Sequence, residues 1–241
     1  MSGMGMLHLE IKQKRMERDF RLRVRVGQPR VSYRETIQRM VESEGSFQRQ
    51  IGATFVDCHV KLAVSPRPQG TLIEYRMDRD QFSPAIITAL DQALRSALAS
   101  GWLGYPIINL RIQVIALRIS PDVPPALNET AVQSAAAEAV HEALRDNVVL
   151  LEPLMHMEVS VPEEYLGPIT ADLQARRAEI MEVHARGKLR VIEALVPLAR
   201  TFDYSEKVRS LSQGRADWTM EPHSYAPAPD EVVRTYFGMD Q

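Results

Sequence analysis

"VDCHVKLAV" (residues 56–64) alternates apolar and polar residues in the pattern of a β-strand that buries one face. The even-numbered residues are all apolar, whereas Asp57, His59 and Lys61 share the opposite face. The following stretch "SPRPQG" (65–70) contains two prolines and a glycine, which end the strand. The segment therefore predicts one strand of a sheet that covers a hydrophobic core.

Strands and helices alternate after this strand. The expected elements are a short strand at 71–75, a helix from Ser83-Pro84 to near Gly101, a strand at 107–117 and a helix at 130–145. Ser83 and Pro84 are a typical N-cap and first-turn pair, and Asn128 is expected to cap the second helix. This order predicts an α+β or α/β layer, for which a right-handed crossover is the general expectation.

A second domain is expected beyond residues 146–151. Its predicted elements are strands at 154–161, 180–184, 189–196 and 216–225, with helices at 165–177 and 204–212. The resulting order is βαββαβ, which is typical of a ferredoxin-like domain. Gly187 is expected to turn the central hairpin, and Gly214 to end the second helix. A short terminal helix is expected at 230–237.

The first forty residues are basic, with ten Lys and Arg residues against four Asp and Glu residues in a chain of net charge −2. Such a segment can mark contact with a polyanion, and a solvated basic helix face is the alternative.

A helical pattern at 7–20 and a strand pattern at 22–26 begin almost at Met1. We therefore expect the chain to be a piece of a longer protein.

The composition, 45% hydrophobic and 25% charged residues over 241 residues, is that of a soluble globular protein. The sequence contains no apolar run long enough to span a membrane and no secretory signal. Cys58 is the single cysteine, so we expect a reducing compartment, no internal disulfide and no zinc site. The cytoplasm is the default location.

Motifs of catalysis are absent from the sequence. "ARGKL" (185–189) lacks the first glycine and the hydroxyl residue of a phosphate loop, and there is no nucleophile elbow or HExxH. Glu163 and Glu164 are adjacent and so do not face each other on a helix. We expect no catalytic residue, no metal and no enzymatic activity of this chain alone.

Two histidines have alternative interpretations. His59, on the exposed face of its strand, could contact RNA or be solvated surface. His156 lies between Met155 and Met157, a position typical of a hydrogen-bonded structural histidine rather than a metal ligand.

Five stretches, in this order and spacing, resemble translation elongation factor G. They are "GMLHLEI" (5–11), "VGQPRVSYRETI" (26–37), "GYPIINLRI" (104–112), "VLLEPLMHMEVSVPEEYLGPITADLQARR" (149–177) and "VPLARTFDYSEKVRSLSQGRADWTME" (196–221). The resemblance implies a remnant of domain III at 1–27, domain IV at 28–148 with the helix 229–238 packed back on it, and a ferredoxin-like domain V at 149–228. It implies an elongated, ribosomal-protein-like domain IV, whose βαβ crossover is left-handed in this family.

In this family the tip of domain IV enters the decoding site. The tip loop usually reads Arg-Gln-Ser-Gly-Gly-Arg-Gly-Gln-Tyr-Gly-His-Val, and the corresponding positions here read "RQIGATFVDCHV" (49–60). The resemblance assigns RNA contact to the first tip loop, at Arg49, Gln50, Ile51, Gly52, Ala53, Thr54 and His59, and to a second loop, at Ser120, Pro121 and Asp122. Thr54 replaces the family's arginine, which should weaken phosphate binding by about one contact. The altered loops, "LRISPDVP" and "YLGPITADLQARRAEI" resemble the ribosome-releasing branch, the mitochondrial-type second elongation factor G or a bacterial paralogue of the same kind.

Domain V is expected to face large-subunit RNA through Arg176, Arg177, Arg209, Gly214 and Arg215, with a solvated helix face as the alternative for the three helix arginines 176, 177 and 209. The implied function is the ribosome-binding arm of a translational GTPase that acts in tRNA–mRNA translocation or in ribosome recycling. GTP and magnesium would belong to a GTPase domain outside this chain. The implied partners are ribosomal RNA, tRNA–mRNA and ribosome recycling factor, for a monomer in the bacterial cytoplasm or, in a eukaryote, the mitochondrion. A free-standing RNA-binding protein and a small enzyme built on the ferredoxin-like domain are the alternatives.

Overall fold

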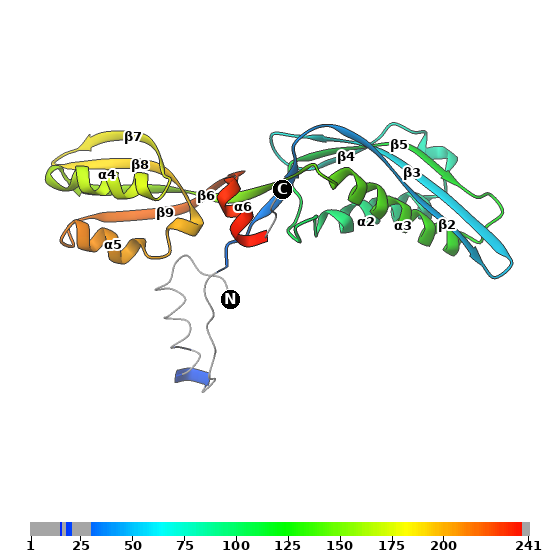
Figure 1. The fold of residues 1–241 in the computed structure, drawn as a ribbon, viewed down its shortest axis with the longest axis horizontal. Helices are drawn as coiled ribbons and strands as arrows, with labels where there is room; N and C mark the ends of the chain where they lie inside the picture. The colour runs from blue at the N-terminus through cyan, green and yellow to red at the C-terminus, as the bar shows by residue number, and fades with distance from the viewer. Residues whose placement is uncertain (1–14, 16–17, 21–29, 238–241) are drawn as a thin grey trace. The chain divides into compact units, whose positions relative to one another are not determined.

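A computed structural model of the chain describes residues 15, 18–20 and 30–237 (Figure 1). The chain divides into two compact units, one of residues 1–32 and 152–226 and the other of residues 33–151 and 227–241. The expected helix at 7–20, strand at 22–26 and domain III remnant at 1–27 lie outside the described residues, apart from residues 15 and 18–20.

The unit of residues 33–151 is built on a four-stranded sheet in the order β2-β3-β5-β4. Its elements are β2 (Val41–Ile51), β3 (Thr54–Pro66), β4 (Leu72–Tyr75), the 3₁₀ turn η1 (Arg79–Gln81), α2 (Pro84–Leu98), β5 (Leu110–Ile119) and α3 (Pro125–Leu144). β3 is antiparallel to β2 and β5, whereas β4 and β5 are parallel and are joined through α2, which makes the expected βαβ crossover. The sequence pattern missed β2, because its residues "VESEGSFQRQI" are mostly polar.

The core of this unit follows the predicted strand. Val56, Cys58, Val60, Leu62 and Val64 are all buried and pack with the apolar faces of the two helices. At the start of α2 the Ser83 hydroxyl oxygen accepts from the Ile86 amide at 3.4 Å, which confirms the predicted cap.

The start of α3 differs from the prediction. The helix begins at Pro125 rather than at residue 130, because a proline fits the first helical position, where no amide donor is needed. Asn128 therefore lies inside the helix and is buried, so it is not the cap. Its side-chain amide donates instead to the backbone carbonyls of Ser120, at 3.1 Å, and Val123, at 3.4 Å.

Two strands and the last helix complete this unit. β1 (Arg34–Ile37) is antiparallel to the first residues of β6 (Val148–Pro162), pairing Arg34 with Leu151 and Ile37 with Val148. The last helix is α6 (Asp230–Phe237), in which Val232 is buried.

The other unit contains most of β6 and the elements that follow it. These are η2 (Glu163–Tyr165), α4 (Leu166–Ala175), β7 (Glu179–Arg186), β8 (Leu189–Pro197), η3 (Leu198–Arg200), α5 (Tyr204–Leu211) and β9 (Asp217–Pro227). The strand order is β9-β6-β8-β7, with the first strand between the third and the last, so the ferredoxin-like prediction is confirmed.

In this ferredoxin-like unit, α4 and α5 pack on one face of the sheet, where Met157, Ile192, Leu173 and Val208 form part of a separate core cluster (Figure 1). Alternation then places His156, Glu158 and Glu193 on the face of the sheet without helices. None of the helices in the described part of the chain has the length and apolar character needed to cross a membrane.

Candidate nucleic-acid interface

The first predicted loop is the tight turn of the β2–β3 hairpin. The two strands pair without interruption to Ile51 and Thr54, which leaves Gly52 and Ala53 as the turn. Gly52 has φ 61°, and no atom lies within 4 Å of the position where its Cβ would be. Backbone conformation, rather than crowding, therefore favours glycine here. The Gln50 side-chain amide donates to the Gly52 carbonyl oxygen at 3.0 Å and closes the turn.

The second predicted loop is hydrogen-bonded to β3 of the same hairpin. The Ser120 amide donates to the Asp57 carbonyl at 3.0 Å, and the Asp57 amide donates to the Ser120 hydroxyl oxygen, also at 3.0 Å. The Ser120 hydroxyl donates back to the Asp57 carbonyl at 3.2 Å. Pro121 and Asp122, which follow, are exposed. The structure thus brings the two predicted loops to one end of the sheet.

One face of this hairpin carries an aromatic ring that the sequence analysis did not select. Phe55 pairs with Gln50 across the hairpin and is 56% exposed, a large fraction for an aromatic side chain. The period of two puts it on the same face as Asp57 and His59, opposite buried Val56. Extending the alternation of residues 56–64 backward by one position would have predicted this exposure.

His59 is held by neighbouring acids rather than standing free. Its Nδ1 lies 3.0 Å from Glu44 Oε1, and its Nε2 lies 3.1 Å from Asp57 Oδ1. The Gln48 side-chain amide also donates to Asp57, at 3.0 Å. Any contact of His59 with RNA would have to replace at least one of these interactions.

The cations at this end of the sheet are few. Arg49 is exposed, with its guanidinium 5.4 Å from the centroid of the Phe47 ring. Arg118, also exposed, pairs with His59 across β3 and β5. Among the described residues neither arginine forms an ion pair, so both guanidinium groups can reach phosphate oxygens.

In the ferredoxin-like unit, Arg176 is engaged inside the protein. Its Nη1 donates to Asp203 Oδ1 and to the Arg200 carbonyl, both at 2.6 Å, and its Nε donates to Asp172 Oδ2 at 2.7 Å. Only 11% of the side chain is exposed, and the guanidinium lies 5.2 Å from the centroid of the Tyr204 ring. The hydrogen bond from Arg176 lowers the pKa of Asp203. This arginine ties the end of α4 to the start of α5.

Arg177 has a similar internal role. It adopts a left-handed backbone conformation with φ 64° just after α4. Its two terminal nitrogens donate to the two carboxylate oxygens of Glu152, at 3.0 and 2.9 Å, and Glu152 is buried. Neither Arg176 nor Arg177 is therefore a solvated helix residue, and releasing either would leave a carboxylate without its partner.

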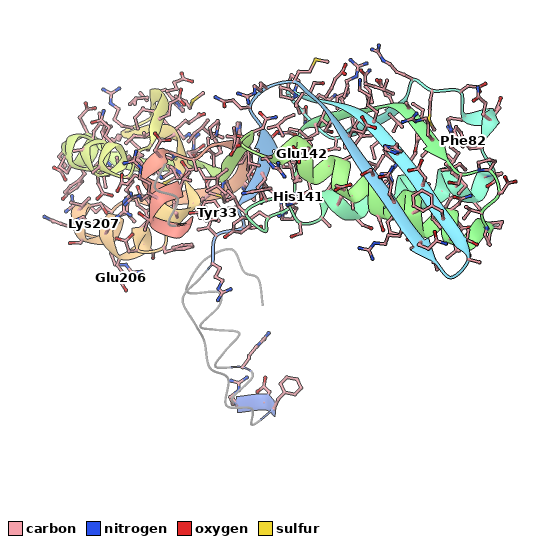
Figure 2. The ribbon with its side chains drawn as sticks, turned by 45° about the vertical axis from the view of Figure 1, so that its right-hand side comes forward. Tyr33, Phe82, His141, Glu142, Glu206 and Lys207 are labelled. Carbon is pink, nitrogen blue, oxygen red and sulfur yellow. The ribbon has the colours of Figure 1, made fainter. Side chains whose placement is uncertain are left out.

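The remaining predicted residues of this unit are at the surface, beside the end of α5. Arg209, Gly214 and Arg215 are all exposed, as are Glu206 and Lys207 on the same helix (Figure 2). Gly214, with φ 76°, donates its amide to the Arg209 carbonyl at 2.8 Å and so ends the helix. Arg215 forms an exposed ion pair with Glu164 at 3.0 Å, which is worth little in water.

Comparisons with known proteins agree with this architecture. Residues 29–147 match the family model for elongation factor G, domain IV, and residues 149–236 match the model for the elongation factor G C-terminus. Elongation factor G of Thermotoga neapolitana is 42% identical over 243 residues, covering 96% of this chain and 34% of that protein. The Thermotoga maritima protein is 41% identical, with the same coverage. A crystal structure from Thermus thermophilus superposes with a TM-score of 0.82 at 29% identity, over 97% of this chain and 35% of that one.

The two matched regions are domains of a translation factor. The chain belongs to the elongation factor G family. It spans about one third of the length of the two Thermotoga proteins. Those relatives carry the name elongation factor G, and the comparisons do not support the narrower assignment to the ribosome-releasing, mitochondrial-type branch.

Proposed function

We propose that this chain is the ribosome-binding arm of an elongation factor G-type translational GTPase and acts by contact rather than by bond-breaking of its own. The observation that supports this most strongly is the hydrogen-bonded junction of the two tip loops through Ser120 and Asp57. Two loops far apart in sequence are held as one surface, so both can meet the same partner. We take that partner to be RNA at the ribosomal decoding region, namely ribosomal RNA and the tRNA–mRNA bound there.

At the tip, the residues that carry the proposed contact are those whose polar groups are free to bind. Arg49 and Arg118 would bind phosphate oxygens, while Gly52 and Ala53 allow a backbone to approach closely. The rest of the contact surface would be formed, without specific polar contacts, by Ile51, Thr54, Pro121 and Asp122. Gln50, Ser120 and His59 act mainly by holding the loops, through the hydrogen bonds described above.

In the ferredoxin-like unit we assign the proposed RNA contact to Arg209, Gly214 and Arg215. Arg176 and Arg177 are reassigned as structural residues, because each would lose bidentate carboxylate partners on binding a phosphate. Glu152 is buried, so removing its Arg177 partner would cost several kcal/mol, roughly 3–5, whereas Asp203 is exposed and its pair with Arg176 contributes less.

Co-sedimentation of the 241-residue chain with ribosomes across a salt series tests the proposal. The expected result is binding that weakens as salt rises, because phosphate contacts release counterions. Arg49→Gln should lower the slope of log affinity against log salt by roughly one unit. Arg67→Gln is the matched control, because Arg67 is also exposed but lies after the other end of β3. Absence of salt-sensitive binding would refute the proposal and favour an activity unrelated to the ribosome.

The step of translation that the arm serves is a second question. Translocation and ribosome recycling both require contact with the ribosome, and the full-length factor is needed to separate them. Peptide synthesis driven by the factor alone would indicate translocation. Subunit splitting that depends on added ribosome recycling factor would indicate recycling, and would make that factor a partner.

A further inference from the structure

The open face of the ferredoxin-like sheet carries a cluster of histidines and glutamates that the proposed function does not use. Glu182 and His184 lie on β7, Glu193 on β8 and His156 on β6. One ligand atom each from Glu182, His184 and Glu193 lies within 4.8 Å of the others. We propose that this cluster binds a divalent transition-metal ion of the zinc type.

Strand register explains why these side chains meet. Glu182 pairs with Glu193 across β7 and β8, and Glu193 pairs with Glu158 across β8 and β6. Three carboxylates therefore lie in one row on neighbouring strands, an arrangement that like-charge repulsion makes unfavourable. Arg186 neutralises Glu158 at 2.8 Å, but among the described residues no lysine or arginine forms an ion pair with Glu182 or Glu193. A cation between these two would remove the repulsion.

His184 supplies a nitrogen ligand with no competing hydrogen bond among the described residues, while His156 Nδ1 lies 3.8 Å from Glu221 Oε1. His184 Nδ1 is shielded from solvent and has no hydrogen-bond partner among the described residues. It lies 3.9 Å from Glu193 Oε1, while the other carboxylate oxygen of Glu193 lies 3.5 Å from His156 Nε2. Glu193 thus faces a ring nitrogen with each of its oxygens.

These separations suit metal ligands better than hydrogen bonds. Hydrogen bonds between nitrogen and oxygen are about 2.7–3.2 Å long. Two ligand atoms that each lie about 2.1 Å from a tetrahedral ion are separated by roughly 3.4 Å. The 3.9 Å between His184 Nδ1 and Glu193 Oε1 is nearer to the second value than to the first, and the 3.5 Å separation joins His156 to the other Glu193 oxygen. By contrast, His59 lies 3.0 and 3.1 Å from its two acids and needs no ion to explain its geometry.

The ligand types select the class of ion. Imidazole nitrogens with carboxylate oxygens suit Zn²⁺, Co²⁺ or Ni²⁺, whereas Mg²⁺ and Ca²⁺ prefer oxygen ligands alone. The three protein ligands would be Glu182, Glu193 and His184. His156 would either hold the second oxygen of Glu193 or itself coordinate the ion. Two carboxylates balance the charge of a divalent ion. Glu182 is exposed, so the ion can enter from solvent.

Spacing along the sequence gave no indication of this site, because its ligands come from neighbouring strands. The hairpin "EVHARGKLRVIE" (182–193) does contain the signal once its turn is placed. β7 ends at Arg186 and β8 begins at Leu189, so register alone puts Glu182 opposite Glu193 and His184 on the same face.

Isothermal titration of the untagged 241-residue chain with Zn²⁺ tests the proposal. One saturable site is expected, and His184→Gln and Glu193→Gln should each weaken binding at least about tenfold. His141→Gln, on α3 of the other unit, is the matched control and should leave binding unchanged (Figure 2). Circular dichroism of each variant verifies folding. Unchanged affinity in both folded ligand variants, or the absence of a saturable site, would overturn the proposal.

Co²⁺ gives a second, independent readout. Its visible absorption reports nitrogen and oxygen coordination, and it should appear with one equivalent of Co²⁺ and disappear when Zn²⁺ is added. The same titration with Mg²⁺ should give no displacement at equal concentration. Displacement of Co²⁺ by Mg²⁺ as readily as by Zn²⁺ would show that the histidines are not ligands and would also overturn the proposal.

Discussion

Among single residues, Phe55 and Arg49 separate two ways in which the tip could make the proposed contact with RNA. An exposed ring can stack on an unpaired base, which is worth roughly 1–3 kcal/mol and depends little on salt. Phe55→Ala should therefore weaken RNA binding about tenfold or more while leaving the salt slope unchanged, the opposite of the effect expected for Arg49→Gln. Fluorescence anisotropy with a short single-stranded RNA, repeated over a salt series, measures both quantities. Equal salt slopes for the original chain, Arg49→Gln and Phe55→Ala would contradict a phosphate contact of Arg49. Unchanged affinity of Phe55→Ala would contradict base stacking by Phe55.

Glu35 is a buried acid whose ionisation should make the stability of its unit depend on pH. Its Oε1 accepts from the amides of Leu103 at 3.0 Å and Tyr105 at 2.7 Å, while Oε2 has no hydrogen-bond partner among the described residues. Burial is the larger effect and raises the pKa of Glu35 above its ordinary 4.5. Because the folded state holds the proton more tightly, this group stabilises the fold fully below 4.5. The stabilisation is lost as the pH rises through the raised pKa.

Glu35→Gln removes this dependence while keeping an oxygen that can accept both amide hydrogen bonds. We expect the free energy of unfolding of the variant, relative to that of the original chain, to rise as the pH rises from below 4.5 to 8. Urea unfolding at several pH values measures the difference. If this difference in the free energy of unfolding stayed constant with pH, or grew toward low pH, the pKa of Glu35 would not be raised in the folded protein.

Among the elements, the contact of α3 with β2 depends on one glycine. A Cβ on Gly45 would lie 2.0 Å from the Ala135 carbonyl oxygen and 2.4 Å from the Ala139 amide nitrogen. Both neighbours are backbone atoms, which cannot rotate away. Gly45→Ala should therefore destabilise the unit by about 3 kcal/mol, at the upper end for overpacking. Urea unfolding measures this loss of stability. Gly104→Ala is the comparison: no atom lies within 4 Å of its Cβ position, so that variant reports backbone strain without crowding.

The link between α4 and α5 depends on Arg176 in a comparable way. Arg176→Gln would leave Asp172 and Asp203 without their main donor, so we expect a loss of about 2–3 kcal/mol in stability. Arg209→Gln on the exposed face of α5 should cost less than about 0.5 kcal/mol. Thermal unfolding compares the two variants. An equal and small effect of both would mean that Arg176 is free to serve as an RNA contact after all.

The predicted elements differ in how far local sequence determined them. Alternation at residues 56–64 and the cap at Ser83 placed β3 and α2 correctly, because each local signal agreed with its burial. β2 was missed because its own eleven residues are mostly polar and show no strand pattern. It is a strand because all of them pair along β3. Asp172 lies four positions before Arg176, a local helical spacing, but the other partners of Arg176 and the partner of Arg177 lie 24 to 27 positions away, which no local pattern indicates.

At the scale of the whole molecule, most of the buried apolar residues that the structure describes form two separate clusters, one in each unit. The sequence placed the change of domain near residues 146–151, and there β6 itself passes from one unit to the other. Separate cores predict that unfolding is not a single two-state transition. Calorimetry should therefore resolve two components. Gly45→Ala should lower the midpoint of one component by several degrees, and Arg176→Gln should lower only the other. A single transition that both variants shift equally would show that the two cores unfold as one cooperative unit.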